Sequence, residues 1–365
     1  MSVNGPFRYY IPPSVENADM VFIPYWRIRG LTYTFGVSGV TGRYTDTNLL
    51  AVPLNGLPPS LGLRPQAMRL KCATAATPGN FVKPTRTLHD VMPQTDRTTR
   101  GTHYDCFIGE TASLIYTPMI VKKGSLYDAV LDKPVAPWTP DESTYPAGPI
   151  DQETRFTAAL CPQCGWDLRG EADALIVTCG NCHTAWSCEK SFWEQIPFAV
   201  MDGTADALVY LPFWRLKAQI SGLQAASMAD FIRLANLPKA VTPAMEEKPL
   251  YFWSPAFKIN PALFLRWSRQ MTIFQPDEGL GSRFPSKRLY PAGLSKNEAA
   301  EGIWVTLGSV ITDKRTFLKD LPDIRIVDLD ALLVYHPFVI GKREVTHERM
   351  GVVMERNALK YGATM

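Results

Sequence analysis

The sequence has little that would mark a secreted, membrane-spanning or strongly charged protein. Its first residues, Met-Ser-Val-Asn-Gly-Pro-Phe-Arg, contain no basic segment followed by an apolar stretch, so we expect no signal peptide. Apolar runs such as Ala207–Trp214 are short and contain proline, whereas a membrane span needs about 20 apolar residues. The net charge of +3 gives no electrostatic reason to expect nucleic acid or an anionic membrane as the main partner.

The common catalytic signatures are also missing from the chain. There is no Gly-x-Gly-x-x-Gly, no phosphate-binding loop, no Gly-x-Ser-x-Gly and no His-Glu-x-x-His. These absences favour a protein that is not an enzyme. They leave open an enzyme whose site lies between two halves of the chain and includes His336 and nearby arginines.

Seven cysteines are present, and only four of them form a recognisable pattern. Cys72, Cys106 and Cys188 are scattered and show no spacing typical of disulfides, which predicts a reducing, cytoplasmic environment. Cys188 follows the last patterned cysteine by six residues, and we expect it to be a buried structural thiol.

The four patterned cysteines form two Cys-x-x-Cys pairs, Cys161 with Cys164 and Cys179 with Cys182, with 14 residues between the pairs. Two intervening residues let each hairpin turn both sulfurs toward one ion, which suits a tetrahedral site with four thiolates. Such a closed site leaves no position for water, so it predicts one structural Zn²⁺ rather than a catalytic one. Rubredoxin-type iron and a dithiol redox motif are the alternatives.

The segment around these cysteines, about residues 158–190, resembles the zinc ribbon of the Cys-Pro-x-Cys-Gly type. Gly165 follows the first pair, and we expect it to adopt a positive φ that aims backbone amides at the thiolates. His183 takes the corresponding place after the second pair, which departs from the commonest pattern. Trp166 and Trp186 are expected to cover the metal or to contact a neighbouring domain. The segment is acidic, which argues against binding to phosphates.

Proline is abundant: it accounts for 30 of the 365 residues, about 8 % of the chain, whereas its usual share is ~5 %. Because proline interrupts helices and central strands, we predict a mostly β (α+β) fold with many short strands. A helix is expected to begin at Ser227, followed by Asp230, and to run towards Asn236. Another is expected at Ser295, where Glu298 completes a capping box, and a third over Val345–Lys360.

Three segments recur in the same order in the two halves of the chain. Val21–Arg29 matches Val209–Lys217 at every position, by identity or by similar chemistry. Weaker matches join Pro65–Leu70 with Pro255–Ile259, and Leu114–Ile120 with Val334–Val339. The order predicts an internal duplication. Pro24 and Pro212, inside the first pair of segments, predict an edge strand or a bulge.

These patterns give four predicted regions. Residues 1–133 form a first β-rich repeat, residues 134–157 a proline-rich linker, residues 158–190 the zinc ribbon, and residues 191–365 a second β-rich repeat. The second repeat is expected to carry an insertion near residues 275–319.

Basic residues recur at matching places, with Arg27 and Arg29 in one half and Arg215 and Lys217 in the other. We expect these residues to meet carboxylates at strand ends; a pseudo-symmetric anion site is the alternative. His336 is expected to be a hydrogen-bonded core residue. His89 and His103 lie near acidic residues, without the spacing of a metal site.

The function expected from these features is that of a structural or adaptor protein, a subunit of a larger assembly with protein partners or self-association. Repeated domains rich in Trp, Tyr and Pro make good docking surfaces. The docking surface is expected in the insertion near residues 275–319, which carries Phe284, Tyr290 and Trp304. A nucleic-acid-binding protein that uses the ribbon or the basic pairs is the first alternative, and an enzyme is the second.

Overall fold

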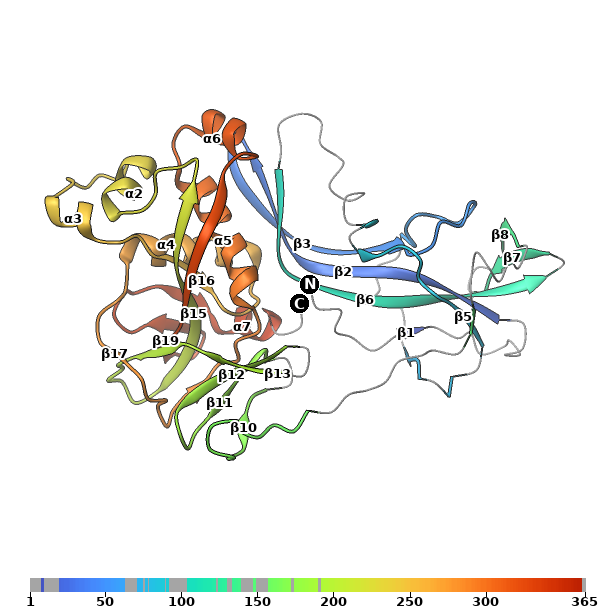
Figure 1. Ribbon diagram of the computed structural model, residues 1–365, viewed down its shortest axis with the longest axis horizontal. Helices are drawn as coiled ribbons and strands as arrows, with labels where there is room; N and C mark the ends of the chain where they lie inside the picture. The colour runs from blue at the N-terminus through green and yellow to red at the C-terminus, as the bar shows by residue number, and fades with distance from the viewer. Residues whose placement is uncertain are drawn as a thin grey trace. The chain divides into compact units, whose positions relative to one another are not determined.

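The fold is mostly β, as the sequence predicts, and it divides into two compact units (Figure 1). The first unit comprises residues 1–30, 45–99 and 110–156, and the second comprises residues 31–44, 100–109 and 157–365. The computed structural model describes residues 8–9, 20–62, 71–74, 76–77, 79–88, 90–91, 104–122, 124–129, 133–138, 147–148, 157–171, 174–189 and 192–362.

Three long strands contribute residues to both units: β2 (Met20–Gly36), β3 (Gly39–Leu50) and β6 (Tyr104–Lys122). Part of β2 is buried on both faces, because its residues Val21–Tyr25 are apolar or aromatic on successive positions. Strands of this length let one segment of chain pack in two cores. Ile23 and Tyr25 belong to the core of the first unit, whereas Leu31 and Tyr33 belong to the core of the second.

The sheet of the first unit runs in the order β4-β1-β6-β2-β5-β9, with β3 paired to β2 and the β7–β8 hairpin paired to β6. Strand β1 is parallel to β6, and β5 is parallel to β2. The bounds of its short strands are β1 (Arg8–Tyr9), β4 (Lys71–Cys72), β5 (Asn80–Val82), β7 (Ser125–Asp128), β8 (Lys133–Pro137) and β9 (Ala147–Gly148).

The main sheet of the second unit runs in the order β16-β15-β19-β14-β17, with β18 paired to β15 and the β20–β21 hairpin paired to β19. Strand β14 is parallel to β19, and β18 is parallel to β15. Its strands are β14 (Phe198–Met201), β15 (Leu208–Ser221), β16 (Phe252–Pro255), β17 (Leu280–Gly281), β18 (Arg288–Leu289), β19 (Arg325–Ile340), β20 (Glu344–His347) and β21 (Val353–Glu355).

Helices of the second unit pack on this sheet. Helices α4 and α5 contact each other and strand β16 (Figure 1), and their buried faces add Trp267 and Ile303 to the core. The helices are α2 (Met228–Ala235), α3 (Pro243–Glu247), α4 (Pro261–Phe274), α5 (Lys296–Val310), α6 (Lys314–Asp320) and α7 (Arg356–Gly362).

Both predicted helix starts are present, and the capping box predicted at Ser295 has a counterpart at Ser227. The hydroxyl of Ser227 accepts from the amide of Asp230, and that of Ser295 accepts from the amide of Glu298. The prediction of a helix over Val345–Lys360 is wrong for most of its length. Strands β20 and β21 occupy residues 344–347 and 353–355, because Gly351 turns the chain at φ 63° and the apolar side chains of Val345 and Met354 face the core.

The prediction of an edge strand around Pro24 and Pro212 is also wrong, because β2 and β15 have neighbours on both sides. Along one edge of β15 the neighbour changes from β18, paired at Val209–Tyr210, to β16, paired at Phe213–Leu216. Pro212 lies at this change. Its carbonyl accepts from the amide of Ala256, so its nitrogen faces the junction, where no ladder hydrogen bond is required.

The segment of residues 275–319 is not an exposed loop. It contains β17, β18, α5 and part of α6, and Phe284, Tyr290 and Trp304 pack against the core of the second unit. These three side chains are only partly buried, so the aromatic docking surface proposed there stays a prediction. Of the predicted proline-rich linker, Pro134 and Pro137 lie in β8.

Candidate metal centre

The four patterned cysteines lie in a small antiparallel sheet of the second unit. The sheet has the order β10 (Leu168–Arg169), β11 (Ile176–Cys179), β12 (Thr184–Glu189) and β13 (Phe192–Ile196). Each Cys-x-x-Cys pair forms a tight turn that ends in a positive φ, 72° at Gly165 and 53° at His183. The positive φ expected for Gly165 is confirmed, and its own amide donates to the carbonyl of Cys161.

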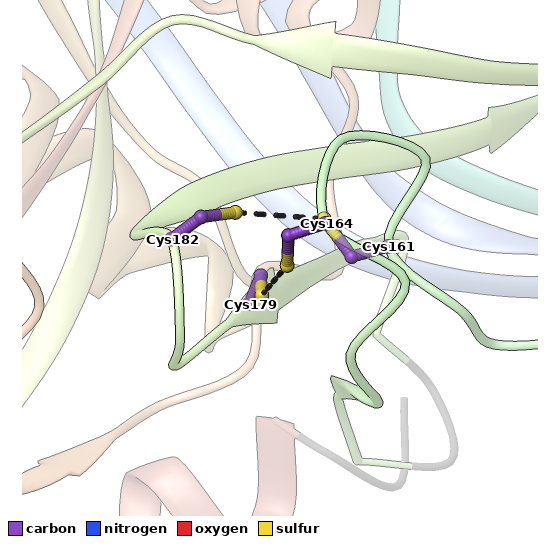
Figure 2. Close-up of side chains that lie close together, drawn as sticks. All are labelled: Cys161, Cys164, Cys179 and Cys182. Atoms are coloured by element: carbon purple, nitrogen blue, oxygen red, sulfur yellow. Dashed lines mark hydrogen bonds between the residues drawn. The ribbon is translucent and has the colours of Figure 1, made fainter.

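The turns bring the four sulfurs together (Figure 2). All four Sγ atoms lie within 4.8 Å of one another. Cys161 and Cys182 approach to 3.6 Å, and Cys164 and Cys179 approach to 3.5 Å. A tetrahedral ion with metal–sulfur bonds of about 2.3 Å sets the sulfurs roughly 3.8 Å apart, so this donor set fits a metal ion. Among the described residues, no other group of three or more His, Cys, Asp or Glu side chains could hold one.

A buried hydroxyl supports the sulfur cluster. Thr184 Oγ1 lies 3.2 Å from Cys182 Sγ and 3.6 Å from Cys161 Sγ, and it accepts from the indole nitrogen of Trp186 at 2.8 Å. The indole thereby turns the hydroxyl proton toward the thiolates. Hydrogen bonds from neighbouring side chains to metal ligands orient those ligands and tune their basicity. Sequence spacing did not identify Thr184, although its place directly between the second Cys pair and Trp186 is a usable signal.

The cluster favours deprotonation of Cys161. Burial raises the pKa of its thiol, but hydrogen bonds from Thr184 and from the backbone amides of Cys164 and Gln163 outweigh burial and lower that pKa to about 6. For Cys182, the hydroxyl of Thr184 lowers the pKa, yet burial and the three neighbouring sulfurs raise it to about 12. Four thiols at this distance cannot all ionise without a cation among them.

The small sheet is joined to the rest of the second unit by several hydrogen bonds. The amide of Leu175 donates to the carbonyl of Ala292 at 2.8 Å, and His183 Nδ1 accepts from the amide of Phe284 at 3.0 Å. Two ion pairs add to these contacts, Arg288 with Glu171 and Lys296 with Glu194, each at 2.9 Å. The side chains of Ile176 and Ile196 belong to the core of the second unit.

The two tryptophans of the segment differ in their surroundings. Trp186 is buried and packs with Cys161, Leu168 and Cys179, as predicted for a residue that covers the site. Trp166 is 55 % exposed, and Leu160 beside it is exposed as well. The prediction that Cys188 is buried is wrong: it is exposed, because it lies on the outer face of β12 opposite Trp193.

The other candidate residues take structural roles. Arg27 is buried and forms a two-point ion pair with Asp46, at 2.9 and 2.7 Å. Arg215, at the matching place, lies over the ring of Tyr251 at 4.5 Å. The two sites thus use their arginines differently, which argues against a pseudo-symmetric anion site. His89 and His103 lie outside the described residues.

His336 is a buried, hydrogen-bonded core residue, as expected, and its partner is a second histidine. Its Nδ1 lies 3.1 Å from Nε2 of His347, whose Nδ1 accepts from the amides of Arg349 and Met350. These bonds assign the proton of His347 to Nε2 and that of His336 to Nε2. His336 Nε2 has no hydrogen-bond partner among the described residues, and its ring stands edge-on to Trp253 and Phe213.

Burial keeps both imidazoles neutral. It lowers the pKa of His347 to about 4, with a smaller contribution from Arg349, and it lowers the pKa of His336 well below the usual value, with smaller contributions from His347 and Arg349. Neither ring is placed to exchange protons with solvent, since both are essentially inaccessible. This pair therefore belongs to the core rather than to a reaction site.

Comparison with protein-family models, with curated proteins and with solved structures found no match for the chain. None of the helices in the described part of the chain is both long and apolar enough to span a membrane.

Proposed function

We propose that the sulfur cluster is a structural zinc site of the zinc-ribbon type, and that the chain is a non-enzymatic adaptor or structural subunit of a larger cytoplasmic assembly. The observation that carries the first part is the closed set of four thiols on two tight turns. A set of four sulfurs leaves no open coordination position, which favours a structural role. Zinc is preferred to iron because the two turns are separated by only 14 residues.

The adaptor role is supported by exposed apolar side chains on the ribbon. Trp166 and Leu160 are exposed near the first turn, and Phe192 at the start of β13 is 79 % exposed. A metal site and several hydrogen bonds to the second unit hold this surface rigid, so that a partner loses little entropy in binding to it. Exposed tryptophan is the residue type most enriched among side chains that dominate interface energies.

This role predicts that Trp166→Ala, combined with Leu160→Ser, abolishes association while the melting temperature stays unchanged. The measurement is affinity capture of the native protein with quantitative identification of what accompanies it, together with sedimentation of the purified chain. Phe274→Ala is the matched control, since Phe274 is 56 % exposed at the end of α4. Retention of every partner by the double variant, or a chain that stays monomeric and without partners, contradicts the proposal.

We further propose that the two β-rich regions arose by internal duplication, with the ribbon as an insert between them. Paired hydrogen bonds support this proposal. The carbonyl of Pro24 accepts from the amide of Ala51 at 3.0 Å, and that of Pro212 accepts from the amide of Ala256 at 3.0 Å. The carbonyl of Ala51 then accepts from two successive amides, those of Thr85 and Arg86, as the carbonyl of Ala256 does from Gly293 and Leu294.

Side chains follow the same correspondence. The indole of Trp26 donates to the carbonyl of Arg86 at 2.8 Å, and that of Trp214 donates to the carbonyl of Leu294 at 2.9 Å. One residue later, Thr87 and Asp90 exchange the hydrogen bonds of a capping box, as Ser295 and Glu298 do.

Strand pairing gives independent support. The parallel strand pair β1–β6 in the first sheet corresponds to the parallel pair β14–β19 in the second. In the same way, the parallel pair β2–β5 corresponds to the parallel pair β15–β18. The amides of Ala129 and Glu348 donate to the carbonyls of Pro118 and Pro337, which agrees with the third sequence match. The second match has no such support: Pro65–Leu70 lies outside the described residues, and the correspondence above pairs Ala256 with Ala51. The additional helices α2 and α3 lie between Pro212 and Ala256.

If the tryptophans are equivalent, Trp26→Phe and Trp214→Phe should lower the free energy of unfolding by similar amounts. We expect about 1–3 kcal/mol each, because either change leaves a buried carbonyl without its donor. Equilibrium unfolding in denaturant measures the loss, and Trp166→Phe at the surface serves as the control with no expected change. A large loss at one position and none at the other would contradict the equivalence.

A further inference from the structure

A cavity of about 380 Å³ opens between the ribbon and the rest of the second unit. It lies where β10 and β11 face the segment of residues 284–291, and its floor reaches β19. Small-molecule sites in proteins commonly have volumes from about 300 to 1,000 Å³ and lie between packed modules. The lining residues that bear on its chemistry are Arg169, Glu171, Phe284, Lys287, Tyr290 and Tyr335.

Tyr335 gives the cavity a buried polar group. Only 1 % of this side chain is exposed, and it lines the cavity from β19. Its ring contacts Phe284, but within the described part of the chain its hydroxyl has no hydrogen-bond partner. Tyr290 differs, because its hydroxyl donates to the carbonyl of Leu359 at 2.9 Å. The hydroxyl of Tyr335 can therefore bind a polar atom of a molecule in the cavity.

The charges of the lining are unbalanced toward positive. Glu171 is engaged by Arg288 at 2.9 Å, so its charge is already compensated. Arg169 is exposed at the cavity and has no carboxylate partner among the residues that the structure describes. The ammonium group of Lys287 has three N–H donors. One of them donates a hydrogen bond to the carbonyl oxygen of Asp206, which leaves two donors for another acceptor.

The apolar part of the lining is made of rings held in fixed positions. Phe284 stacks on Phe198 with ring centroids 4.2 Å apart, which fixes its orientation, and Tyr290 is held by its hydrogen bond to Leu359. Proline residues flank both rings, at Pro285 and Pro291. Rings and prolines in fixed positions suit a planar ligand body, since such surfaces stack with little loss of conformational freedom.

We propose that this cavity binds a small organic anion with a planar apolar body, its acidic group held by Arg169 and Lys287 and a polar atom of its body bound by the hydroxyl of Tyr335. Carboxylates, sulfonates and phosphate monoesters share this chemistry. Guanidinium groups recognise all of them through paired, charge-assisted hydrogen bonds. The proposal is independent of the adaptor role, because it concerns the inner face of the ribbon and not the exposed Trp166.

The test uses the zinc-loaded, full-length chain and the fluorescent probe 8-anilinonaphthalene-1-sulfonate, which combines a sulfonate with aromatic rings. We expect one saturable site per chain. Arg169→Ala should weaken binding about ten-fold or more, because it removes a charge-assisted contact. Tyr335→Phe should weaken it about three-fold or more, through loss of one neutral hydrogen bond. Arg325→Ala, at the other end of β19, is the matched control and should bind normally.

A third variant keeps the proposal open to refutation if the others disturb folding. Ser286→Trp places a bulky side chain at an exposed position of the lining, so it should block the probe without lowering the melting temperature. Binding that does not saturate, or affinity unchanged in all three variants, would overturn the proposal.

Discussion

Replacing Cys179 with serine should remove the bound metal and unfold the ribbon. Structural zinc sites with thiolate ligands contribute on the order of 10–16 kcal/mol of binding free energy in isolated peptides near neutral pH. Loss of one ligand forfeits much of that energy, and two of the remaining sulfurs, those of Cys161 and Cys182, lie 3.6 Å apart and repel each other when ionised. Elemental analysis should find one zinc per wild-type chain and none in the variant.

The stability of the variant should also show how strongly the ribbon supports the rest of the second unit. Because Ile176 and Ile196 belong to the core of the second unit, we expect the melting temperature of that unit to fall while its sheet remains folded. Cys188→Ser is the matched control, since Cys188 is an exposed cysteine on the same strand as Thr184 and should change neither metal content nor melting. Iron in the wild-type protein, or a metal-free chain with two disulfides, would contradict the assignment.

Lowering the pH should destabilise the second unit through the buried pair of His336 and His347. Both folded-state pKa values lie below that of an unfolded histidine, about 6.5. The stabilising effect of the pair is therefore complete above pH 6.5, and it is lost as the pH falls, because the unfolded chain then takes up protons that the folded chain does not. The loss continues to about pH 4, where His347 is protonated in the folded state.

Two groups that titrate in this way lower the free energy of unfolding by up to about 4 kcal/mol between pH 6.5 and pH 5. Denaturant unfolding at pH 8, 7, 6 and 5 measures the slope. The combined substitution His336→Gln and His347→Asn removes both titrating rings, while the asparagine oxygen is still able to accept from the amides of Arg349 and Met350. The variant should be less stable at pH 8 but should lose less stability on acidification. Parallel slopes in the two proteins would assign the acid sensitivity to other groups, such as the four clustered cysteines.

The features that the sequence predicted well are those fixed by neighbouring residues. Two Cys-x-x-Cys turns position their own sulfurs, and Ser295 finds Glu298 three residues away, so spacing alone predicts the geometry. The mostly β fold followed from the prolines and β-branched residues. Each of these signals acts within a few residues of the chain.

The errors concern features set by distant residues. The stretch Val345–Lys360 has spacing compatible with a helix, but β19 offers an open edge and draws residues 344–347 into the sheet. The glycines and prolines of residues 275–319 suggested a loop, yet three of its aromatic side chains are partly buried against the core of the second unit. Deleting residues 279–293 would therefore remove core contacts and not a dispensable segment. The exposure of Cys188 depended on which face of β12 meets the core.

The prolines of β2 and β15 have a consequence for how the chain avoids misfolding. A strand that slides by one residue turns its backbone over, and the nitrogen of Pro212 would then face β19 in place of a hydrogen-bond donor. A slide by two residues would set the same nitrogen against β16 or β18, with the loss of a bond there. Only the native alignment puts the missing donor at the junction of two neighbours. One imino acid thus penalises the nearest incorrect alignments of a strand whose apolar residues alone would tolerate several.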